Sequence, residues 1–492
     1  MSSPLESRLQ DAQLLQTRAF IDGCWQAGEH GSFAVTDPAT GAHLADVADV
    51  SVAQVQQAIA AAQAAWPDWR ERSAHERSAL LMRWHALLMQ HQGDLACLMT
   101  AEQGKPLAEA RGEVAYGASF VQWFAEQARR VAGEVLAAPG KGQRLFVLRQ
   151  PVGVCAAITP WNFPLAMITR KVAPALAAGC PVVIKPSELT PLTALAAAEL
   201  ARRAGLPAGV LNVITGTRSS EYGQALCASP VVRHLSFTGS TEVGRILMAQ
   251  CAPTVKKLSL ELGGNAPFIV FDDADIPAAV QGAFASKFRN AGQTCVCANR
   301  FYVQAGVYDE FVRQFTARVQ AARVGNGFDE GVEIGPLIEP AALQKVQQHV
   351  ADALARGGQI ATGGHALPAL GSGQFHEATV IANASADMLC TREETFGPLA
   401  PIVRFETETQ AIAAANASEY GLAAYFYSQN PARIWRVAEA LESGMVGVNT
   451  GLISNEVAPF GGVKQSGLGR EGSVHGIDEY LEMKYVCQGA LA

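Results

Sequence analysis

The sequence has no excess of basic residues. Of its 492 residues, 38 are Lys or Arg and 45 are Asp or Glu, which gives a formal net charge of -7 and a pI near 5.9. A nucleic-acid-binding surface needs clustered Lys and Arg, so this balance argues against a nucleic-acid partner. A small-molecule partner is favoured instead.

Long apolar runs are also missing. The stretch from Val172 to Ile184 contains Pro and Gly and is flanked by Lys171 and Lys185, so it is too short to span a bilayer. Residues 1–16 mix charged residues with isolated leucines and lack the basic start and apolar core of a secretory signal. We therefore expect a cytoplasmic protein with no membrane partner.

The 10 cysteines are scattered, and no Cys/His set has the spacing of a zinc site. Scattered cysteines in a long chain fit a reducing compartment better than a disulfide framework. We expect no metal. Cys295 and Cys297 form a close pair, separated by a single Val.

The G-x-G-x-x-G fingerprint of many dinucleotide-binding proteins is absent after the first strand of the α/β region. That region nevertheless alternates short apolar strands with helices, which predicts right-handed crossovers and a parallel sheet covered on both faces. This is a doubly wound nucleotide-binding layout. The expected strands are 152–158, 182–185, 210–214, 232–237 and 255–260, and the expected helices are 165–178, 192–204, 220–228 and 241–252.

Other segments flank this region. Apolar residues at helical spacing predict helices over 51–66, 74–103 and 114–131, with Ser51 and Ser73 as caps of the first two. Strands are expected over 145–149 and 480–486, and a second α/β segment over 266–458.

Cys295 lies in a polar passage of small residues, Asn290 to Cys297. Such a position can leave a thiol partly exposed, with backbone N–H groups pointing at the atom that it attacks. Most free cysteines are instead buried as small hydrophobes. A second signal favours chemistry, because Glu261 lies in the apolar run Leu260 to Asn265. A buried carboxylate is costly unless it is paired or kept for proton transfer.

Five motifs together resemble the signatures of the NAD(P)-dependent aldehyde dehydrogenases. They follow that family's order at about its spacing, and the similarity extends from about Phe20 to the C-terminus. Within the family, the chain is most similar to the succinate-semialdehyde dehydrogenases. The motifs are Glu261-Leu262-Gly263-Gly264, Gly292-Gln293-Thr294-Cys295, Trp161-Asn162-Phe163-Pro164, Glu394-Thr395-Phe396-Gly397-Pro398 and Pro459-Phe460-Gly461-Gly462.

The resemblance implies an α/β fold with three parts. A doubly wound Rossmann-type cofactor-binding domain comprises 1–128 and 151–263, an α/β catalytic domain comprises 264–465, and a small β element for oligomerisation comprises 129–150 and 466–492. In the family this hairpin joins subunits, so a homodimer or homotetramer is expected. The residues alone leave an ordinary surface hairpin equally open.

The resemblance also implies oxidation of an aldehyde to a carboxylic acid. Cys295 would attack the carbonyl as a thiolate and form a thiohemiacetal and then a thioester. The Asn162 side chain and the Cys295 backbone N–H would hold the oxyanion, and Glu261 would activate the hydrolytic water. From the residues alone, Asn162 could also be an Asx cap in a tight turn.

We expect NAD or NADP as the cofactor, with NAD slightly favoured. Glu188 can accept hydrogen bonds from both ribose hydroxyls but would repel a 2′-phosphate, which Lys185 and Ser187 could hold if Glu188 moved away. Ser240 at a helix N-terminus can donate to pyrophosphate, although serine is also a common cap. The complete expected set is Trp161, Lys185, Ser187, Glu188, Gly239, Ser240, Gly244, Glu394 and Phe396.

Arg170, Arg289 and Ser454 match the set that succinate-semialdehyde dehydrogenases use for the carboxylate of the substrate, while Phe163 and Phe460 keep part of an aromatic wall. A guanidinium donates two parallel hydrogen bonds to a carboxylate. From the residues alone, each arginine could instead be a solvent-exposed residue on a helix, which is the more common case.

The expected reaction is therefore oxidation of succinate semialdehyde to succinate, in 4-aminobutyrate degradation. Glutarate semialdehyde, or a broader range of aldehydes, stays open because one methylene contributes little discrimination. A cofactor-independent esterase is the alternative from another class. Cys297 could pair with Cys295 under oxidant as a reversible switch, or be a buried bystander.

Overall fold

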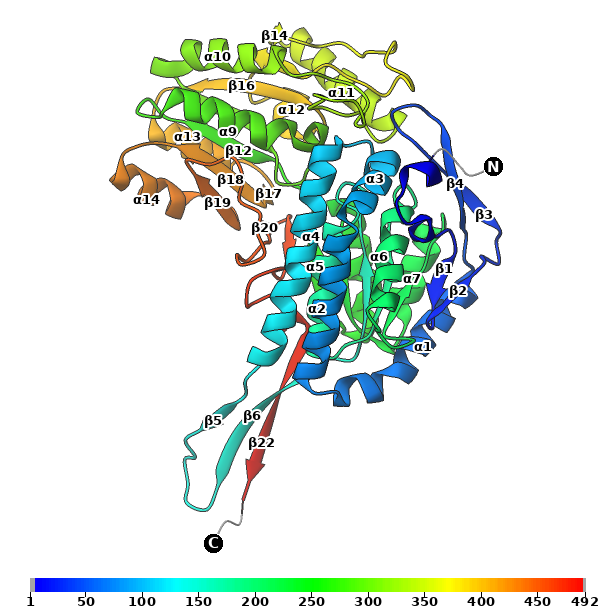
Figure 1. Ribbon diagram of the computed structural model, residues 1–492. Helices are drawn as coiled ribbons and strands as arrows, with labels where there is room; N and C mark the ends of the chain where they lie inside the picture. Colours follow the sequence, from blue (N-terminus) through cyan, green and yellow to red (C-terminus); the bar gives the residue numbers. More distant parts are fainter. Residues whose placement is uncertain (1–4, 490–492) are drawn as a thin grey trace.

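The computed structural model describes residues 5–489, so residues 1–4 and 490–492 of the segments 1–128 and 466–492 lie outside the described residues. One large sheet organises the first half of the chain (Figure 1). Its strands follow the order β2-β1-β9-β8-β7-β10-β11-β21. They are β1 (Ala19–Ile21), β2 (Cys24–Gln26), β7 (Val154–Ile158), β8 (Val182–Lys185), β9 (Leu211–Val213), β10 (Val232–Thr238), β11 (Lys257–Glu261) and β21 (Gly467–Leu468).

The centre of this sheet, from β9 to β11, is parallel, and a helix follows each of its first four strands. The helices are α5 (Ala166–Ala178), α6 (Pro191–Arg203), α7 (Ser219–Ala228) and α8 (Thr241–Cys251). Two apolar cores lie against the sheet, one containing α5 and α6 and the other α7 and α8. The predicted doubly wound layout is therefore confirmed.

The N-terminal helices extend both cores. They are α1 (Val52–Glu71), α2 (Ala74–Gln90), α3 (Gln92–Gln103) and α4 (Leu107–Gln127). Ser51 and Ser73 form capping boxes as predicted. The predicted helix 74–103 is two helices that meet at His91, and the helix predicted to start at residue 114 starts at Leu107. Gly104 ends α3 with φ 91°, and a Cβ there would lie 2.6 Å from Pro336 Cγ.

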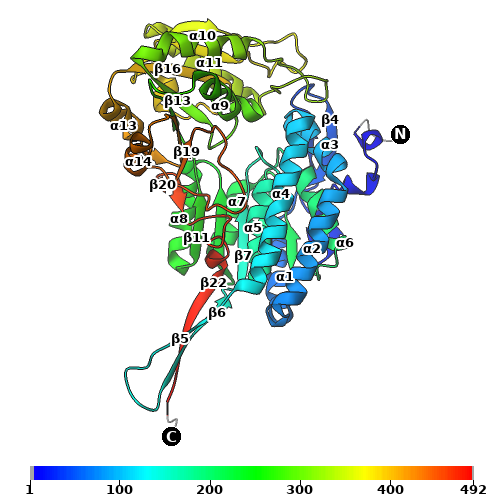
Figure 2. The ribbon, with the colours of Figure 1, turned by 60° about the vertical axis from the view of Figure 1, so that its left-hand side comes forward.

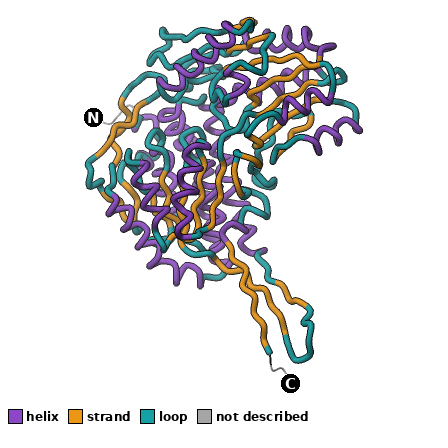
Figure 3. The backbone as a smooth tube through the Cα atoms, turned by 180° about the vertical axis from the view of Figure 1, so that it is seen from behind, coloured by secondary structure: helices purple, strands orange, loops and turns teal. Residues whose placement is uncertain are grey.

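A second sheet forms the other large body (Figure 3). Its order is β14-β15-β16-β13-β12-β18-β19. The strands are β12 (Ala266–Val270), β13 (Ala298–Gln304), β14 (Gln359–Thr362), β15 (Thr379–Ala382), β16 (Leu399–Phe405), β18 (Ala423–Tyr427) and β19 (Met445–Val448). Its helices are α9 (Ile276–Phe288), α10 (Tyr308–Gln320), α11 (Pro340–Ala355), α12 (Leu389–Arg392), α13 (Glu408–Asn416) and α14 (Pro431–Ala440). The second α/β segment is confirmed.

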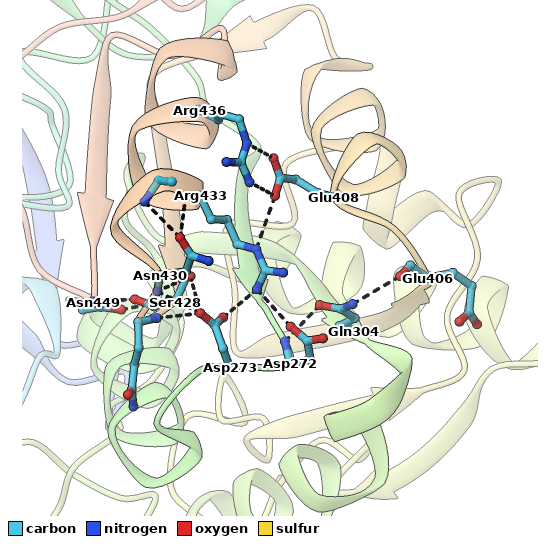
Figure 4. A network of polar contacts seen from close by, with 12 residues as sticks. Asp272, Asp273, Gln304, Glu406, Glu408, Ser428, Asn430, Arg433, Arg436 and Asn449 are labelled. Carbon is cyan, nitrogen blue, oxygen red and sulfur yellow. Dashed lines mark hydrogen bonds and ion pairs between the residues drawn. The ribbon is translucent and has the colours of Figure 1, made fainter.

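A polar network fastens α13 and α14 to this sheet (Figure 4). Asp273, just after β12, accepts hydrogen bonds from Ser428 Oγ at 2.9 Å and the Asn430 backbone N–H at 2.8 Å. Arg433 bonds to Asp273 at 2.7 Å and to Glu408 at 3.3 Å. None of these residues lines the two cavities described below, so the network is structural.

A three-stranded antiparallel arm, β22-β6-β5, projects from the body (Figures 1 and 2). It consists of β5 (Glu134–Leu136), β6 (Arg144–Pro151) and β22 (Leu481–Gln488), which contain the strands predicted at 145–149 and, apart from its first residue, at 480–486. Val135, Met483 and Tyr485 on the arm are exposed by 74%, 70% and 60%. The exact domain boundaries stay a prediction.

Membrane-spanning segments were sought among residues 5–489. None of the helices there combines the length and the apolar character that crossing a bilayer requires.

Candidate active site

A strained turn presents Cys295. After α9, Asn290, Ala291 and Gly292 adopt left-handed backbone conformations with φ of 53°, 55° and 76°. A Cβ on Gly292 would lie 2.2 Å from Gly397 O, so this position requires glycine. Asn290 Nδ2 donates to Asn162 O at 3.0 Å, which holds the turn in place. Such strain persists only where the surroundings fix it, and it is frequent at functional sites.

Cys295 is half-buried and opens into a cavity of ≈ 270 Å³. The cavity brings together the three predicted catalytic residues and five of the predicted cofactor residues. Its lining comprises Cys295, Glu261, Asn162, Trp161, Gly239, Ser240, Glu394 and Phe396, with Pro160, Met167, Thr238, Leu262, Gly263 and Lys345.

Glu261 ends β11, where the carboxyl edge of the parallel strands meets the cavity. Its Oε2 is buried and has no hydrogen-bond partner among the described residues. Burial, and then the nearby Glu471 carboxylate, raise the pKa of Glu261 well above its ordinary value. A carboxylate in such surroundings is suited to taking up a proton near neutral pH.

Glu471 is a second buried carboxylate that the sequence did not reveal. Its Oε2 lies 2.7 Å from Arg170 Nη2, and its Oε1 pairs with Lys171, which also donates to Ser236 Oγ at 3.0 Å. Burial opposes ionisation, but Lys171 and Arg170 outweigh it and lower the pKa of Glu471. Glu471 thus stays ionised while Glu261 can hold a proton, a separation of roles that suits acid–base work.

Asn162 faces the turn that carries Cys295. Its Nδ2 donates to Gln293 O at 3.0 Å, and its Oδ1 is buried without a partner among the described residues. The side chain therefore makes no local Asx bond. An amide nitrogen carries two hydrogens, so one remains for an oxyanion in the cavity.

The Cys295 thiol is protonated at rest. Burial, with smaller contributions from the Glu394 and Glu261 carboxylates, raises its pKa to about 12, although Arg170 acts in the opposite direction. Because the thiolate is the nucleophile, attack requires a base or a change in the surroundings of the sulfur.

Glu394 and Phe396 lie on a loop that is fixed from several sides. Glu394 Oε1 accepts from the Gly264 N–H at 3.1 Å, and Lys345 Nζ donates to Glu394 O at 2.6 Å. Burial raises the pKa of Glu394 to about 7. Phe396, at φ 53°, makes an edge contact with Trp161 at 5.6 Å between ring centroids. The loop can place a carboxylate and an aromatic face against a bound ring and ribose.

Lys185 and Glu188 meet at the end of β8. Lys185 Nζ lies 2.6 Å from Glu188 Oε2 and 2.8 Å from Ser219 Oγ. Burial acts to raise the pKa of Glu188, but Lys185 outweighs it and the pKa is lowered, so the carboxylate is ionised. Ser187 lies beside this pair, and its Oγ accepts from the Leu189 N–H at 3.2 Å. An ionised acceptor here suits ribose hydroxyls.

The position of Ser240 is compatible with both of its predicted roles, a helix cap and a donor to pyrophosphate. Its Oγ accepts from the Val243 N–H at 3.3 Å as the cap of α8, and the residue also lines the cavity. Gly244 does not line this cavity. A Cβ there would lie 2.5 Å from Leu262 Cδ2, so its glycine is required by packing of α8.

A second cavity of ≈ 300 Å³ lies on the other side of the Asn162-Phe163 pair. Arg289 and Ser454 line it as predicted, and the Arg289 guanidinium lies 4.7 Å from the Phe163 ring centroid. Among the described residues, no carboxylate forms an ion pair with Arg289. The complete lining is Lys105, Glu109, Gly112, Glu113, Tyr116, Phe163, Arg289, Leu452 and Ser454.

Arg170 differs from the expected open clamp. It is 1% exposed, pairs with Glu471, and stacks 3.9 Å from the buried Phe460 ring and 5.5 Å from Phe120. It lines neither cavity. Burial opposes its charge, but the acidic neighbours Glu471, Tyr116 and Glu261 raise its pKa above the ordinary value. Arg170 is a fixed internal cation between the two cavities, and direct binding of substrate by it stays a prediction.

Cys297 is buried. Its Sγ donates to Gly292 O at 3.3 Å, and Lys287 Nζ lies 3.9 Å away. Both Cys295 and Cys297 are free thiols. The redox pairing therefore stays a prediction.

The sequence did not reveal that one face of α4 lines the second cavity. Lys105, just before α4, pairs with Glu113 and donates to Asn162 O at 2.8 Å. Glu113 Oε1 accepts from the N–H of Leu165 at 3.0 Å, near the start of α5. A signal was present, because Glu109, Glu113 and Tyr116 follow Gly104-Lys105-Pro106 at helical spacing.

Comparison with known proteins agrees with this geometry. A model of the aldehyde dehydrogenase family matches residues 25–486. The chain belongs to the aldehyde dehydrogenase family. The resemblance found from the motifs is thus confirmed. The prediction that the chain is an NAD(P)-dependent oxidoreductase is confirmed with it. Among residues 5–489, no group of three or more His, Cys, Asp or Glu residues is arranged to hold a metal ion.

Relatives within the family act on several acidic aldehydes, according to their names. Mitochondrial succinate-semialdehyde dehydrogenase of Homo sapiens is 58% identical over 98% of this chain and 90% of its own. 3-Sulfolactaldehyde dehydrogenase of Pseudomonas putida is 57% identical over 98% and 99%, and glutarate-semialdehyde dehydrogenase of Pseudomonas aeruginosa is 55% identical over 98% and 100%. The crystal structure of succinate-semialdehyde dehydrogenase from Burkholderia pseudomallei has a TM-score of 0.96 at 58% identity, covering 98% of this chain and 99% of that one.

The raised pKa of Cys295 predicts slow alkylation that speeds up with pH. In the protein without cofactor or substrate, the rate of iodoacetamide labelling of Cys295 should rise about tenfold per pH unit between about pH 7 and 9, because the thiolate fraction does. Mass spectrometry of the labelled peptide measures it, with Cys295→Ala as the blank. A plateau in the rate below about pH 8 would contradict the raised pKa.

The Lys185–Glu188 pair predicts a change in cofactor choice. Glu188→Gln removes the charge that repels a 2′-phosphate, so kcat/KM with NADP should rise relative to NAD by about tenfold. Steady-state kinetics with both cofactors gives this ratio. Glu221→Gln, on an exposed position of α7, is the matched control. An unchanged ratio in Glu188→Gln would remove Glu188 from the cofactor site.

Proposed function

We propose that the chain oxidises succinate semialdehyde to succinate with NAD(P)+, through Cys295 as nucleophile. The observation that carries this proposal is the pair of cavities lined by two adjacent residues, Asn162 in the first and Phe163 in the second. One holds Cys295 with Glu261, and the other offers Arg289 and Ser454 to an anionic group. The names of the relatives at 55–58% identity support an acidic aldehyde as substrate.

The residues around the first cavity fit a nicotinamide dinucleotide. The N-terminus of α8 at Ser240 offers backbone N–H groups for pyrophosphate, and Glu188 and Glu394 offer ionisable acceptors for the two riboses. The space beside Gly263 is narrow, since a Cβ there would lie 3.0 Å from Glu394 Oε2. When bound, the cofactor accepts a hydride from the reacting carbon.

Attack begins when Cys295 loses its proton. Glu261 is the nearby buried carboxylate whose raised pKa suits proton uptake, and Arg170 favours the thiolate electrostatically. The sulfur then bonds to the carbonyl carbon, and the resulting oxyanion is held by Asn162 Nδ2 and the Cys295 backbone N–H. Removing one such donor typically costs about 3 kcal/mol in the transition state.

After hydride loss, Cys295 carries the acyl group as a thioester. Once Glu261 has released to solvent the proton that it took from Cys295, it takes a proton from water, the hydroxide attacks the acyl carbon, and the carbon–sulfur bond breaks to release the acid and the Cys295 thiolate. Glu471, held ionised by Arg170 and Lys171, keeps a negative charge near Glu261 and so favours proton uptake by it.

The second cavity selects the far end of the substrate. Arg289 lacks a carboxylate partner of its own among the described residues, and Ser454 adds a hydroxyl donor. Glutarate semialdehyde is the second candidate substrate, because one extra methylene changes binding by only about 1–3 kcal/mol. One relative is named a glutarate-semialdehyde dehydrogenase, which supports glutarate semialdehyde as this second candidate.

We further infer a cytoplasmic homodimer or homotetramer, built through the arm, that acts in 4-aminobutyrate degradation. The apolar residues Val135, Met483 and Tyr485 are exposed on a narrow three-stranded sheet whose outer edges are unpaired in the described chain. Such edges are commonly covered by another chain. The 8-stranded sheet, the 7-stranded sheet and the three-stranded arm support the three domains proposed from the sequence.

The test is a panel of aldehydes of different length and charge, each with NAD and NADP. Reduced cofactor should appear fastest with succinate semialdehyde. Ester hydrolysis without any cofactor-linked oxidation would instead assign the chain to the esterase class.

Glu261→Gln separates the two halves of the reaction. The variant should keep a burst of reduced cofactor, slowed because Glu261 also takes the thiol proton, while steady-state turnover falls at least about 100-fold, because general-base catalysis contributes that much. Rapid-mixing kinetics measures both phases. Cys295→Ala, which lacks the nucleophile, should show neither. Normal steady-state turnover in Glu261→Gln would exclude Glu261 as the general base.

Arg289→Ala tests recognition of the carboxylate. For succinate semialdehyde, kcat/KM should fall about 10- to 100-fold, since hydrogen bonds to charged groups contribute about 1.5–3 kcal/mol, while propanal should lose less than about threefold. Arg313→Ala, at an exposed position on α10, is the matched control. Equal losses on both aldehydes would rule out the anion site.

A further inference from the structure

Tyr116 has a buried hydroxyl that completes no full hydrogen bond with the described residues. The residue lies on α4, and its ring makes an edge contact with Phe120 at 5.0 Å between centroids. The phenol oxygen is inaccessible to solvent and has no partner of full hydrogen-bond geometry among residues 5–489, although the Ser454 hydroxyl is close enough to interact with it. Buried polar groups are nearly always satisfied, so an orphaned one indicates a missing ligand or water.

The hydroxyl belongs to the second cavity, which Tyr116 lines together with Arg289, Ser454 and Phe163. Arg170 is also near, because its guanidinium is 5.5 Å from the ring of Phe120, which contacts the Tyr116 ring. Both Arg170 and Arg289 therefore act on the Tyr116 hydroxyl. Neither Arg289 nor Ser454 is sequence-adjacent to it, so only the packing of α4 brings these groups together.

The electrostatics make Tyr116 a donor. Burial raises the pKa of the phenol, and Arg170, Arg289 and the Ser454 hydroxyl each act to lower it, which leaves it above its ordinary value. The group therefore keeps its proton at neutral pH. A neutral O–H near two guanidinium groups can donate to the Ser454 hydroxyl or to an acceptor in the cavity, and an anionic acceptor is the one that the surrounding charge favours.

The acidic residues of the same cavity do not compete for this hydroxyl. Glu113 is paired with Lys105 and accepts from the N–H groups that begin α5. Glu109 Oε2 accepts from the Asn290 N–H at 2.9 Å. Both carboxylates already accept hydrogen bonds from backbone N–H groups of the protein. Tyr116, Ser454 and Arg289 therefore remain as the donors available to a ligand in this cavity.

We propose that Tyr116 donates a hydrogen bond to the distal anionic group of the substrate and is a specificity-determining residue for acidic aldehydes. This inference rests on the proposed function and names one more contact in the same site. The alternative role is packing alone, in which the ring matters and the oxygen does not. Tyr116→Phe distinguishes the two, because it keeps the ring and removes only the oxygen.

The experiment compares succinate semialdehyde with butanal, which has the same chain length and no charge. In Tyr116→Phe, kcat/KM for succinate semialdehyde should fall about 10- to 100-fold and kcat/KM for butanal less than about threefold. Inhibition by succinate should weaken by a similar factor, while inhibition by the uncharged butanamide should not. This second readout requires no turnover of the acidic aldehyde.

Tyr308→Phe is the matched control. Its hydroxyl accepts from the Asn383 N–H at 2.8 Å in the second sheet and touches neither cavity, so both substrates should be unaffected. Equal changes on both aldehydes in Tyr116→Phe, or none on either, would overturn the proposal for Tyr116.

Failure of the proposed function gives a different result. The wild-type enzyme would then prefer another acidic aldehyde, such as glutarate semialdehyde or 3-sulfolactaldehyde, and the Tyr116→Phe comparison is made with that substrate. If wild type prefers no acidic aldehyde over butanal, both proposals are wrong.

Discussion

Two neighbouring buried carboxylates, Glu261 beside the Cys295 thiol and Glu471 behind it in contact with Arg170, impose the central constraint on this molecule. A low-dielectric interior does not tolerate Glu261 and Glu471 both ionised without cations, and the fold supplies Arg170 and Lys171 to only one of them. Glu471 therefore keeps its charge, and Glu261 is left without a partner and with a raised pKa. The same cation, Arg170, also acts on the Cys295 sulfur.

The position of Cys295 depends on contacts between elements that are distant in sequence. The left-handed turn before Cys295 is held by Asn162 and by Gly397, which belong to the cofactor-binding half and the later loop respectively. Lys105 then fixes the backbone of Asn162 from α4. Because each of these supports comes from a different element, the two large bodies must be correctly packed before the thiol can face the cavity.

The recognisable motifs lie where glycine or a reactive side chain is required, which is why the sequence could reveal them. Gly292 avoids a clash with Gly397, and Glu261 interrupts an apolar strand. Helix caps such as Ser51 depend on local geometry and were likewise predictable. The α4 face was missed because its residues read as an ordinary amphipathic helix, and only the packing of α4 on α5 turns Tyr116 and Glu113 inward.

The sequence by itself determined the doubly wound sheet and the family and marked Cys295 and Glu261 as candidate catalytic residues, because these follow from local periodicity and from motifs whose residue types permit few other uses. The tertiary structure alone decided how the arginines divide their work. Arg170 looked like an open clamp and is a buried partner of Glu471, whereas Arg289 faces a cavity. The reason is physical: the charge state and exposure of a side chain are set by the neighbours that folding brings to it, and Arg170 and Glu471 are 301 positions apart in the chain.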